Sequence, residues 1–473
     1  MPFNDQRLGA ADVLTLGFGT TAAMWSLAYF CRLFGSAVPA PLNFALLIAC
    51  LLAGGTLAGR YSLRGVRGGL YVGLLSGTLN LLIVGSLIGG DTPHEIKLGA
   101  LLWGPGTLVL SAILGSLGAA LGRTRVRPPV REPDWPGLFA AVAACAAFML
   151  LGVGGLVTGF DAGLAVPDWP NTEGYNMFLY PLSRMTGGIY GKYLEHAHRL
   201  LGSLVGLTTL VLAVHTQVTD RRRWLRTLAW LVLGLVIVQG ILGGLRVTGH
   251  PTLSSRPSDT SPSIVLAIVH GVVGQLVFAA LVAVAVFRSR AWRENHPVIA
   301  PTSATTDRVL GVALLVLLIG QLVLGALVRH LTWPVQSQRF GLVADPAQLV
   351  ALGRHMLHLH VAVAVLVALL TVGVGVRAWG LYPHLPPLPR LGASLLVLIA
   401  TQVALGIAAL VVTGNVAPNR RPQALDVAIT TAHQLVGAVL LAWALMVVLW
   451  NYRLIARGER LPERPTPSPE GTG

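Results

Sequence analysis

The chain has 473 residues, of which 11% are charged and 54% hydrophobic, and its mean hydropathy is +0.69. A soluble domain carries roughly 25% charged residues, so this composition excludes an ordinary soluble protein. The net charge of +15 lies almost wholly between the apolar runs. In a soluble protein such an excess would suggest nucleic-acid binding, whereas here the positive-inside rule explains it. We therefore expect a lipid membrane and no nucleic acid as partner.

Apolar runs close to the length of about twenty residues that spans a bilayer recur along the whole chain. They predict an all-α, multi-pass membrane protein with about twelve transmembrane helices. The predicted spans are 13–34, 42–59, 70–89, 98–121, 137–158, 194–215, 227–246, 264–287, 308–328, 353–376, 391–413 and 428–450.

Arginine clusters occupy alternate loops, which predicts the side of the membrane on which each loop lies. With twelve spans, both termini and every cluster fall on the cytoplasmic side. We expect a bacterial-type cytoplasmic membrane and no cleavable signal peptide, because the first apolar run lacks a basic flank and a second span follows it. The clusters are Arg60, Arg64 and Arg67; Arg123, Arg125, Arg127 and Arg131; Arg221, Arg222, Arg223 and Arg226; Arg288, Arg290 and Arg293; Arg377 and Arg390; and the tail from Arg453.

The two ends of the chain differ from the middle. Residues 1–125 form four spans whose role the sequence does not indicate. The Pro-, Glu- and Gly-rich tail, 456–473, is predicted to be disordered. The three cysteines, at 31, 50 and 145, lie inside predicted spans, which leaves no external disulfide pair and no CxxC motif.

An internal duplication organises the rest. EHAHRLLGSLVGL near residue 196 aligns with LHLHVAVAVLVAL near 358 at an offset of 162, which places His198 over His360. IVHGVVGQLVF aligns with TAHQLVGAVLL at an offset of 163, which places His270 over His433. We therefore predict two four-helix units, 137–290 and 305–455, and repeats of this kind commonly place their site at or between the copies.

A glutamine that precedes a glycine by four residues marks the spans between these segments. Small residues let helices approach closely, and glutamine can hydrogen-bond across an interface. Helix packing is the simpler interpretation of this motif. The pairs are Gln239 and Gly243, Gln321 and Gly325, and Gln402 and Gly406.

Four histidines lie at similar depth near the non-cytoplasmic ends of the second and fourth helices of each unit: His198, His270, His360 and His433. Ionisable groups in a membrane normally face the bundle interior with a partner. Zinc ordinarily takes three or four ligands, whereas haem needs one or two axial ligands and a tall apolar slot. The pattern favours two bis-histidine haem sites over isolated packing histidines, with the iron as the bound metal.

Glu195 distinguishes the first site from the second. It lies three residues before His198 and shares its helix face, whereas His196 faces elsewhere. A carboxylate beside a cofactor can handle protons. The alternative is an interfacial ion pair with Arg199, four residues on. The second copy has Leu357 in place of Glu195, so the two sites are not equivalent.

GGLVTGFDAGLAVPDWP (154–170), LEHAHRLLGSLVG (194–206) and AHQLVGA (432–438) resemble the haem A synthase family over about 137–450. The Glu-x-x-His-Arg element with paired downstream histidines is its specific part. The resemblance implies an eight-helix duplicated bundle that oxidises a methyl group of haem O to the formyl group of haem A during assembly of terminal oxidases. Some relatives carry a cysteine pair in the first external loop, and this chain has none in 159–193.

Carried onto this chain, the resemblance implies that Glu195 is the catalytic carboxylate. His198 and His270 would flank the substrate haem O, and His360 and His433 would ligate a haem B cofactor. A haem O synthase would supply the substrate, a terminal oxidase would receive the product, and the electron acceptor is not implied. The supporting residues that we single out are Arg199, His196, His358, Asp168 and Trp169.

Two other functions remain open: a non-catalytic di-haem electron carrier of the cytochrome b kind, and a transporter with a duplicated fold. The Glu195 asymmetry favours the enzyme over the carrier. The first external loop, 159–193, is rich in aromatic residues, and we expect it to fold over the first haem slot as a lid. The alternative is a loosely held interfacial loop with Trp169 among the lipid headgroups.

Overall fold

The computed structural model describes residues 10–33, 38–93, 95–123, 132–186, 190–295, 298–299, 304–331, 346–414 and 423–456. These residues are nearly all helical, apart from loops and a pair of two-residue parallel strands, β1 (Val298–Ile299) and β2 (Ile455–Ala456). The predicted all-α fold is confirmed. The predicted disordered tail lies outside the described residues, except for residue 456.

Twelve helices within the described residues are long and apolar enough to cross a membrane, as predicted. Several extend past the predicted spans, because a helix can continue beyond the hydrocarbon layer. The long helices are α1 (Ala11–Leu33), α2 (Ala40–Tyr61), α3 (Val66–Ile88), α4 (Trp103–Arg123), α5 (Trp135–Gly159), α7 (Tyr190–Thr219), α8 (Arg223–Thr248), α9 (Ile264–Arg288), α11 (Ala304–Leu331), α13 (Pro346–Gly380), α14 (Pro387–Gly414) and α15 (Ala424–Leu454). The short ones are η3 (Leu98–Ala100), η4 (Met177–Leu179), α6 (Leu182–Thr186), η5 (Pro257–Asp259) and α10 (Arg290–Glu294).

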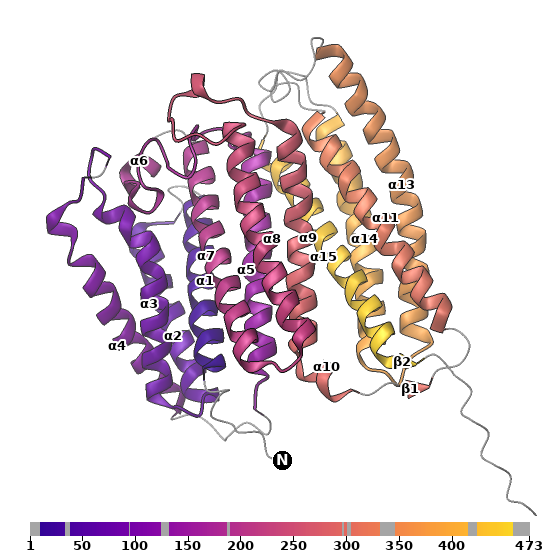
Figure 1. The fold of residues 1–473 in the computed structure, drawn as a ribbon, viewed down its shortest axis with the longest axis horizontal. Coiled ribbons are helices and arrows are strands. Elements are labelled where there is room, and N and C mark those ends of the chain that lie inside the picture. The colour runs from indigo at the N-terminus through magenta and orange to yellow at the C-terminus, as the bar shows by residue number, and fades with distance from the viewer. Residues whose placement is uncertain are drawn as a thin grey trace, which may run out of the picture.

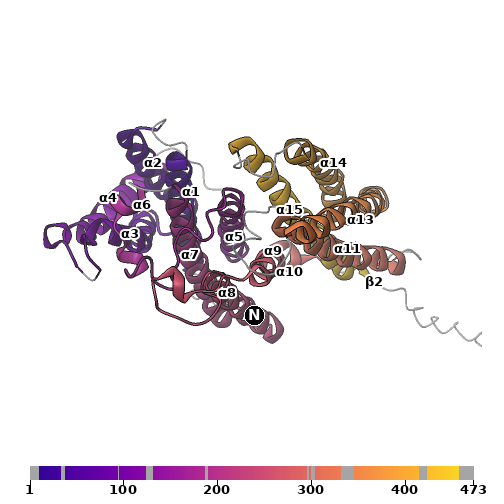
Figure 2. The same cartoon turned by 90° about the horizontal axis from the view of Figure 1, so that it is seen from above.

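The long helices form three groups along the long axis of the molecule (Figures 1 and 2). The first group is α1–α4, the second is α5 with α7–α9, and the third is α11 with α13–α15. Helices α5 and α9 contact α15, and α9 also contacts α11, so the second and third groups meet along these helices. Helix α1 begins and α15 ends at the same end of the molecule, as an even number of crossings requires (Figure 1).

Glycines let the first group pack backbone against backbone. A Cβ on Gly55 or on Gly69 would lie only 2.2 or 2.3 Å from the carbonyl oxygen of Gly115 in α4. A Cβ on Gly73 would lie 2.1 Å from the Ser111 carbonyl oxygen. Such contacts permit only glycine and suit helices that associate in lipid, where close packing replaces hydrophobic burial.

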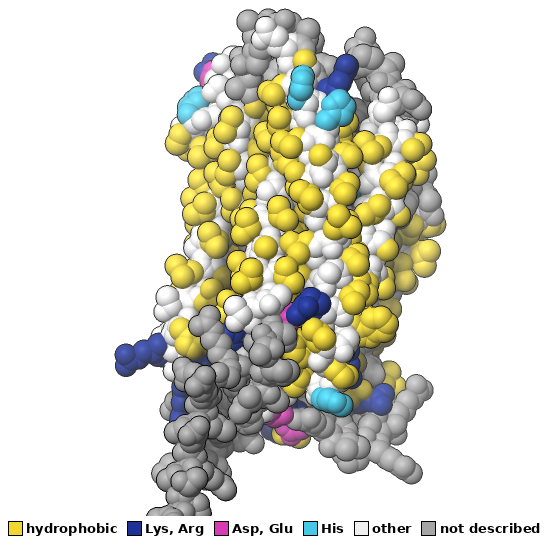
Figure 3. Space-filling model, turned by 90° about the vertical axis from the view of Figure 1, so that its right-hand side faces the viewer, with side chains coloured by type: hydrophobic (Ala, Val, Ile, Leu, Met, Phe, Trp, Pro, Cys, Tyr) yellow, Lys and Arg dark blue, Asp and Glu magenta, His cyan; other side chains and the backbone are white. Residues whose placement is uncertain are grey.

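The surface carries the signature of a membrane protein. Figure 3 shows hydrophobic side chains over the middle of one face, with histidine and basic side chains mainly towards its two ends. Large apolar side chains such as Leu369 in α13 and Val316 in α11 are about two-thirds exposed, at 67% and 64%. An apolar surface of this extent indicates contact with lipid rather than water.

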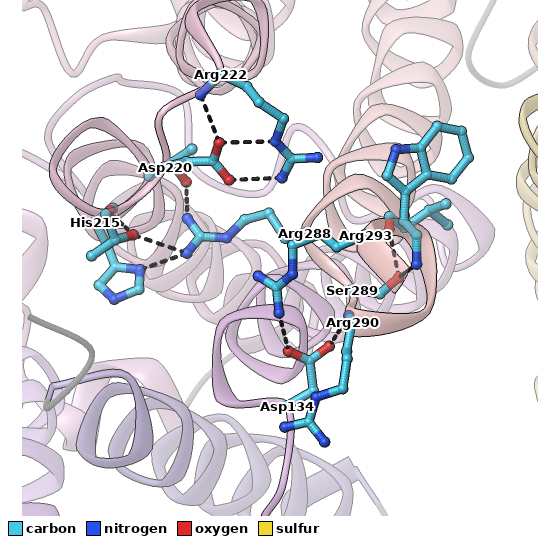
Figure 4. A network of polar contacts seen from close by, with 12 residues as sticks. Asp134, His215, Asp220, Arg222, Arg288, Ser289, Arg290 and Arg293 are labelled. Atoms are coloured by element: carbon cyan, nitrogen blue, oxygen red, sulfur yellow. Dashed lines mark hydrogen bonds and ion pairs between the residues drawn. The ribbon is translucent and has the colours of Figure 1, made fainter. Parts of the chain in front are cut away.

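A polar network closes the end of the second group at which the arginine clusters lie (Figure 4). Arg288, at the end of α9, is buried and donates to Nδ1 of His215 at 3.0 Å and to the Thr216 hydroxyl, both in α7. Asp134, which precedes α5, accepts from Arg293 at 3.1 Å. These contacts join α7 to α9 and α5 to α10 at one end of the group, and His198 and His270 lie towards the opposite ends of α7 and α9.

Candidate functional site

The four predicted histidines meet in two pairs, one in each four-helix group. The rings of His198 in α7 and His270 in α9 have their centroids 6.4 Å apart. The rings of His360 in α13 and His433 in α15 are also 6.4 Å apart. Two imidazoles that share a metal at metal–nitrogen distances of about 2 Å have ring centres roughly 6 Å apart. Both pairs therefore have the spacing of a bis-histidine site.

Each histidine packs against a glycine of another helix in its own group. A Cβ on any of these glycines would lie 2.8–3.2 Å from the Cε1 atom of the histidine, which is closer than a side chain normally allows. The glycines of the sequence motif thus provide the space that the rings occupy. The pairs are Gly154 with His198, Gly243 with His270, Gly325 with His360, and Gly406 with His433.

The glutamines of the same motif also contact the histidines. Gln239 donates to the His270 carbonyl oxygen at 2.6 Å, and Gln321 donates to that of His360 at 2.9 Å. Gln402 lies 3.4 Å from Nε2 of His433. The fourth equivalent position, four residues before Gly154, holds Leu150. The predicted duplication stays a prediction, and these equivalent contacts favour it.

The histidine pairs fit a haem iron better than a zinc ion. The Nδ1 atoms of His198, His360 and His433 are buried without a hydrogen-bond partner. The described part of the chain contains no group of three or more His, Cys, Asp or Glu side chains arranged to hold a metal. A tetrahedral zinc site needs such a group, whereas haem iron is complete with two axial nitrogens.

Glu195 lies buried in the N-terminal half of α7, with 4% of its surface exposed. Its Oε1 accepts from Arg199 at 2.8 Å in a buried ion pair, and its Oε2 accepts from the Val166 backbone N–H at 2.8 Å. The ion pair of the alternative interpretation is therefore present. A catalytic role for Glu195 has to operate from within this pair.

The loop between α5 and α7, predicted to be external, packs over this end of α7, as the predicted lid requires. Arg199 donates to the carbonyl oxygens of Asp168 at 2.7 Å and Asn171 at 2.8 Å. The Trp169 ring fills the space beside Gly244 in α8, where a Cβ would lie 2.2 Å from the indole. Trp169 is thus packed against a helix of the histidine bundle, rather than placed among lipid headgroups.

Inside the loop, carboxylates hold a turn whose backbone has positive φ at Glu173 and Gly174. Asp168 is fully buried and accepts from both of these backbone N–H groups, at 2.7 and 2.8 Å. Burial alone would raise the pKa of Glu173, but donors from Lys192 and Tyr180 outweigh it and leave that pKa below its ordinary value. Burial and the neighbouring Glu173 carboxylate raise the pKa of Tyr180.

The two secondary histidines have different surroundings. His196 is fully buried, lies 3.2 Å from the Thr172 hydroxyl, and packs its ring against Tyr180 with centroids 5.0 Å apart. It therefore contacts the loop rather than the histidine pair. His358 is exposed on α13, so it lies outside the second pair.

Sequence reasoning missed Arg246 in the last turn of α8. Its Nη2 donates to the Gly163 carbonyl oxygen of the loop at 2.8 Å, and its charge interacts with Glu195. The signal was an arginine at the end of a predicted span that we expect on the non-cytoplasmic side, where the positive-inside rule does not place one. Arg246 adds a second cation beside the Glu195 carboxylate.

In a comparison with protein families, the model described as cytochrome oxidase assembly protein (COX15-CtaA) matches residues 137–445. Searches of curated proteins and of solved structures found no match. The matched range contains both histidine pairs and the loop, and it leaves out α1–α4.

Proposed function

We infer that this chain, which belongs to the family of cytochrome oxidase assembly proteins, is a haem A synthase that oxidises a methyl group of haem O to the formyl group of haem A. One observation carries the proposal. Among the described residues, the two histidine pairs have the same spacing, but Glu195, whose carboxylate binds the loop at Val166, lies one helical turn from His198 of the first pair. Leu357 takes the place of Glu195 beside the second pair. A site for chemistry and a site for electron transfer would differ in this way.

In the proposed reaction, His198 and His270 hold the substrate haem and His360 and His433 hold haem B. Haem B would supply one-electron redox chemistry at the second pair. Converting a methyl to a formyl group takes up the oxygen of a water molecule and releases electrons and protons, so the reaction needs water at the methyl group and a separate electron acceptor. Glu195 accepts and returns protons, and the loop held by Arg199 shields the reacting edge from bulk solvent.

Two arginines lie beside the Glu195 carboxylate. Arg199 forms a buried ion pair with Glu195, and the charge of Arg246 interacts with the same carboxylate. The ion pair also orients the carboxylate, since one oxygen is held by Arg199 and the other by the Val166 N–H. Movement of the loop would break the hydrogen bond from the Val166 N–H to this carboxylate, so the position of the loop would be coupled to proton transfer by Glu195.

The proposal places the chain between two other proteins in the same membrane. A haem O synthase supplies the substrate, and a terminal oxidase receives haem A. Both termini lie in the cytoplasm, so the histidine pairs and the loop lie near the outer face of the membrane.

A di-haem electron carrier is the second candidate. It is favoured by the hydrogen bonds to both Glu195 oxygens, because a carboxylate held on both sides can serve as a structural partner of Arg199 and the loop. Extraction of pigment from the purified protein separates the two functions. Haem O or haem A beside haem B supports the synthase, whereas haem B alone in a cell that makes haem O supports the carrier. The direct test adds haem O and an electron acceptor and follows the appearance of haem A.

A further inference from the structure

The α1–α4 bundle lies outside the matched family range, yet it touches the loop that binds Glu195 and Arg199 beside the first histidine pair. The contact is made by the external end of α3. A Cβ on Gly85 would lie 2.1 Å from the Phe178 carbonyl oxygen, and one on Gly89 would lie 1.9 Å from that of Leu179. Two glycines one helical turn apart therefore form a groove that accepts the loop backbone. A residue larger than glycine at either of these two positions would collide with that backbone.

A polar anchor lies beside this groove. The Asp91 carbonyl oxygen, two residues after Gly89, accepts from the Tyr175 hydroxyl at 2.6 Å and from Arg184 at 3.0 Å. The turn that presents this oxygen is itself braced, because the Glu95 carboxylate accepts from the Asp91 and Thr92 backbone N–H groups at 3.0 and 3.1 Å. The loop is thus bound to α3 by shape and by hydrogen bonds.

The bundle is also fixed to the helices that carry the site. Tyr29 in α1 stacks on Tyr193 in α7, with centroids 5.7 Å apart and planes 16° apart. At the opposite end of α1, the Thr15 hydroxyl donates to the Trp135 carbonyl oxygen of α5 at 3.1 Å. A support attached to both α5 and α7 can hold the loop at a constant position relative to the histidines.

Contacts lead from the anchor to the helix turn that carries Glu195. Tyr175 packs edge-on against Tyr180, with centroids 5.6 Å apart, and Tyr180 packs on His196. Tyr180 is fully buried, and its hydroxyl donates to Glu173 at 2.6 Å. A shift of the loop at α3 would therefore disturb the α7 turn next to the proposed catalytic carboxylate.

We propose that the α1–α4 bundle is a positioning domain, which holds the 160–186 loop closed over the first histidine pair through the Gly85–Gly89 groove and the Asp91 carbonyl. It contributes no reacting group. The inference concerns the loop position and does not depend on which reaction the first site performs.

The test is limited chymotrypsin digestion of the purified full-length chain, with cleavage in 165–185 as the readout. We expect the double variant Gly85→Ala and Gly89→Ala to be cleaved about tenfold faster than the unaltered chain, because the added methyl groups displace the loop. The matched control is Gly104→Ala with Gly106→Ala in α4, since a Cβ at either position meets nothing within 4 Å. We expect its cleavage rate to be unchanged.

A second variant covers the case in which the double glycine variant does not fold. Tyr175→Phe keeps the ring and the cleavage site but removes the hydrogen bond to Asp91, so we expect about two- to tenfold faster cleavage. Equal cleavage rates for Tyr175→Phe and the unaltered chain, or for the two double-glycine variants, would overturn the proposal. Haem O conversion measured in parallel tests the proposed function separately, because cleavage is read without any haem chemistry.

Discussion

Replacing Glu195 by glutamine separates proton transfer from structure more cleanly than any other change in the first site. The Glu195 carboxylate accepts from Arg199 and from the Val166 backbone N–H, each at 2.8 Å. Glutamine has the same shape, but its amide oxygen can satisfy only one of these donors. Its NH2 group faces the other donor, and it cannot titrate at working pH.

The magnitude follows from these contacts. Losing one charge-assisted hydrogen bond costs about 1.5–3 kcal/mol, so the equilibrium constant for opening of the loop rises by at most about ten- to 150-fold. Losing a general acid–base group costs about a hundred- to ten-thousand-fold in rate. We therefore expect haem binding to persist while conversion of haem O falls by more than the loop effect explains.

The assay extracts pigment to measure bound haem and follows formation of haem A over time, with Arg199→Lys as the control. Arg199→Lys removes the guanidinium group that donates to the Asp168 and Asn171 carbonyl oxygens but keeps the Glu195 carboxylate. Compared with Glu195→Gln, we expect Arg199→Lys to loosen the loop more and to slow conversion of haem O less. Near-normal conversion in Glu195→Gln, or an equal loss in both variants, would show that Glu195 acts only as the partner of Arg199. Loss of haem from Glu195→Gln would make the residue structural.

Three further predictions concern the histidine pairs and the loop. His360→Ala or His433→Ala should abolish the low-spin haem B spectrum and activity, and a full spectrum with normal turnover in both would refute the second site. Gly243→Ala places a methyl group 2.8 Å from the His270 ring and should weaken haem binding at the first pair by about five- to 150-fold. The control Gly240→Ala, whose methyl group meets nothing within 4 Å, should leave haem binding unchanged. Equal haem retention in the two variants would contradict the packing argument. Because the folded state lowers the Glu173 pKa, its contribution to loop stability is present above the ordinary carboxyl value of 4.5 and is lost as the pH falls below it. Hydrogen-exchange protection in 160–186, corrected for the pH dependence of intrinsic exchange, should fall only in that acidic range, and Glu173→Gln should remove this fall. A transition near neutral pH would assign it to another group.

The membrane fold could be predicted from the sequence because its determinants are local. A run of about twenty apolar residues has to form a helix to satisfy its backbone in lipid, whatever the rest of the chain does. The two histidine pairs could be predicted from their offsets, since helices two and four of a bundle face a common interior. Glu195 could be singled out by its spacing from His198, but spacing allowed both a cofactor-facing carboxylate and an ion pair with Arg199.

The contacts between distant segments were decided by the tertiary structure alone. No local pattern shows that Val166 binds Glu195, that Trp169 packs on Gly244, or that the glycines of the Gln-x-x-x-Gly motif make room for histidine rings. The role of α1–α4 is the clearest case, because Gly85 and Gly89 read as ordinary helix-packing residues until the loop backbone lies against them. Which surface fills such a groove depends on how whole helices are arranged, and that information is shared among residues far apart in the chain.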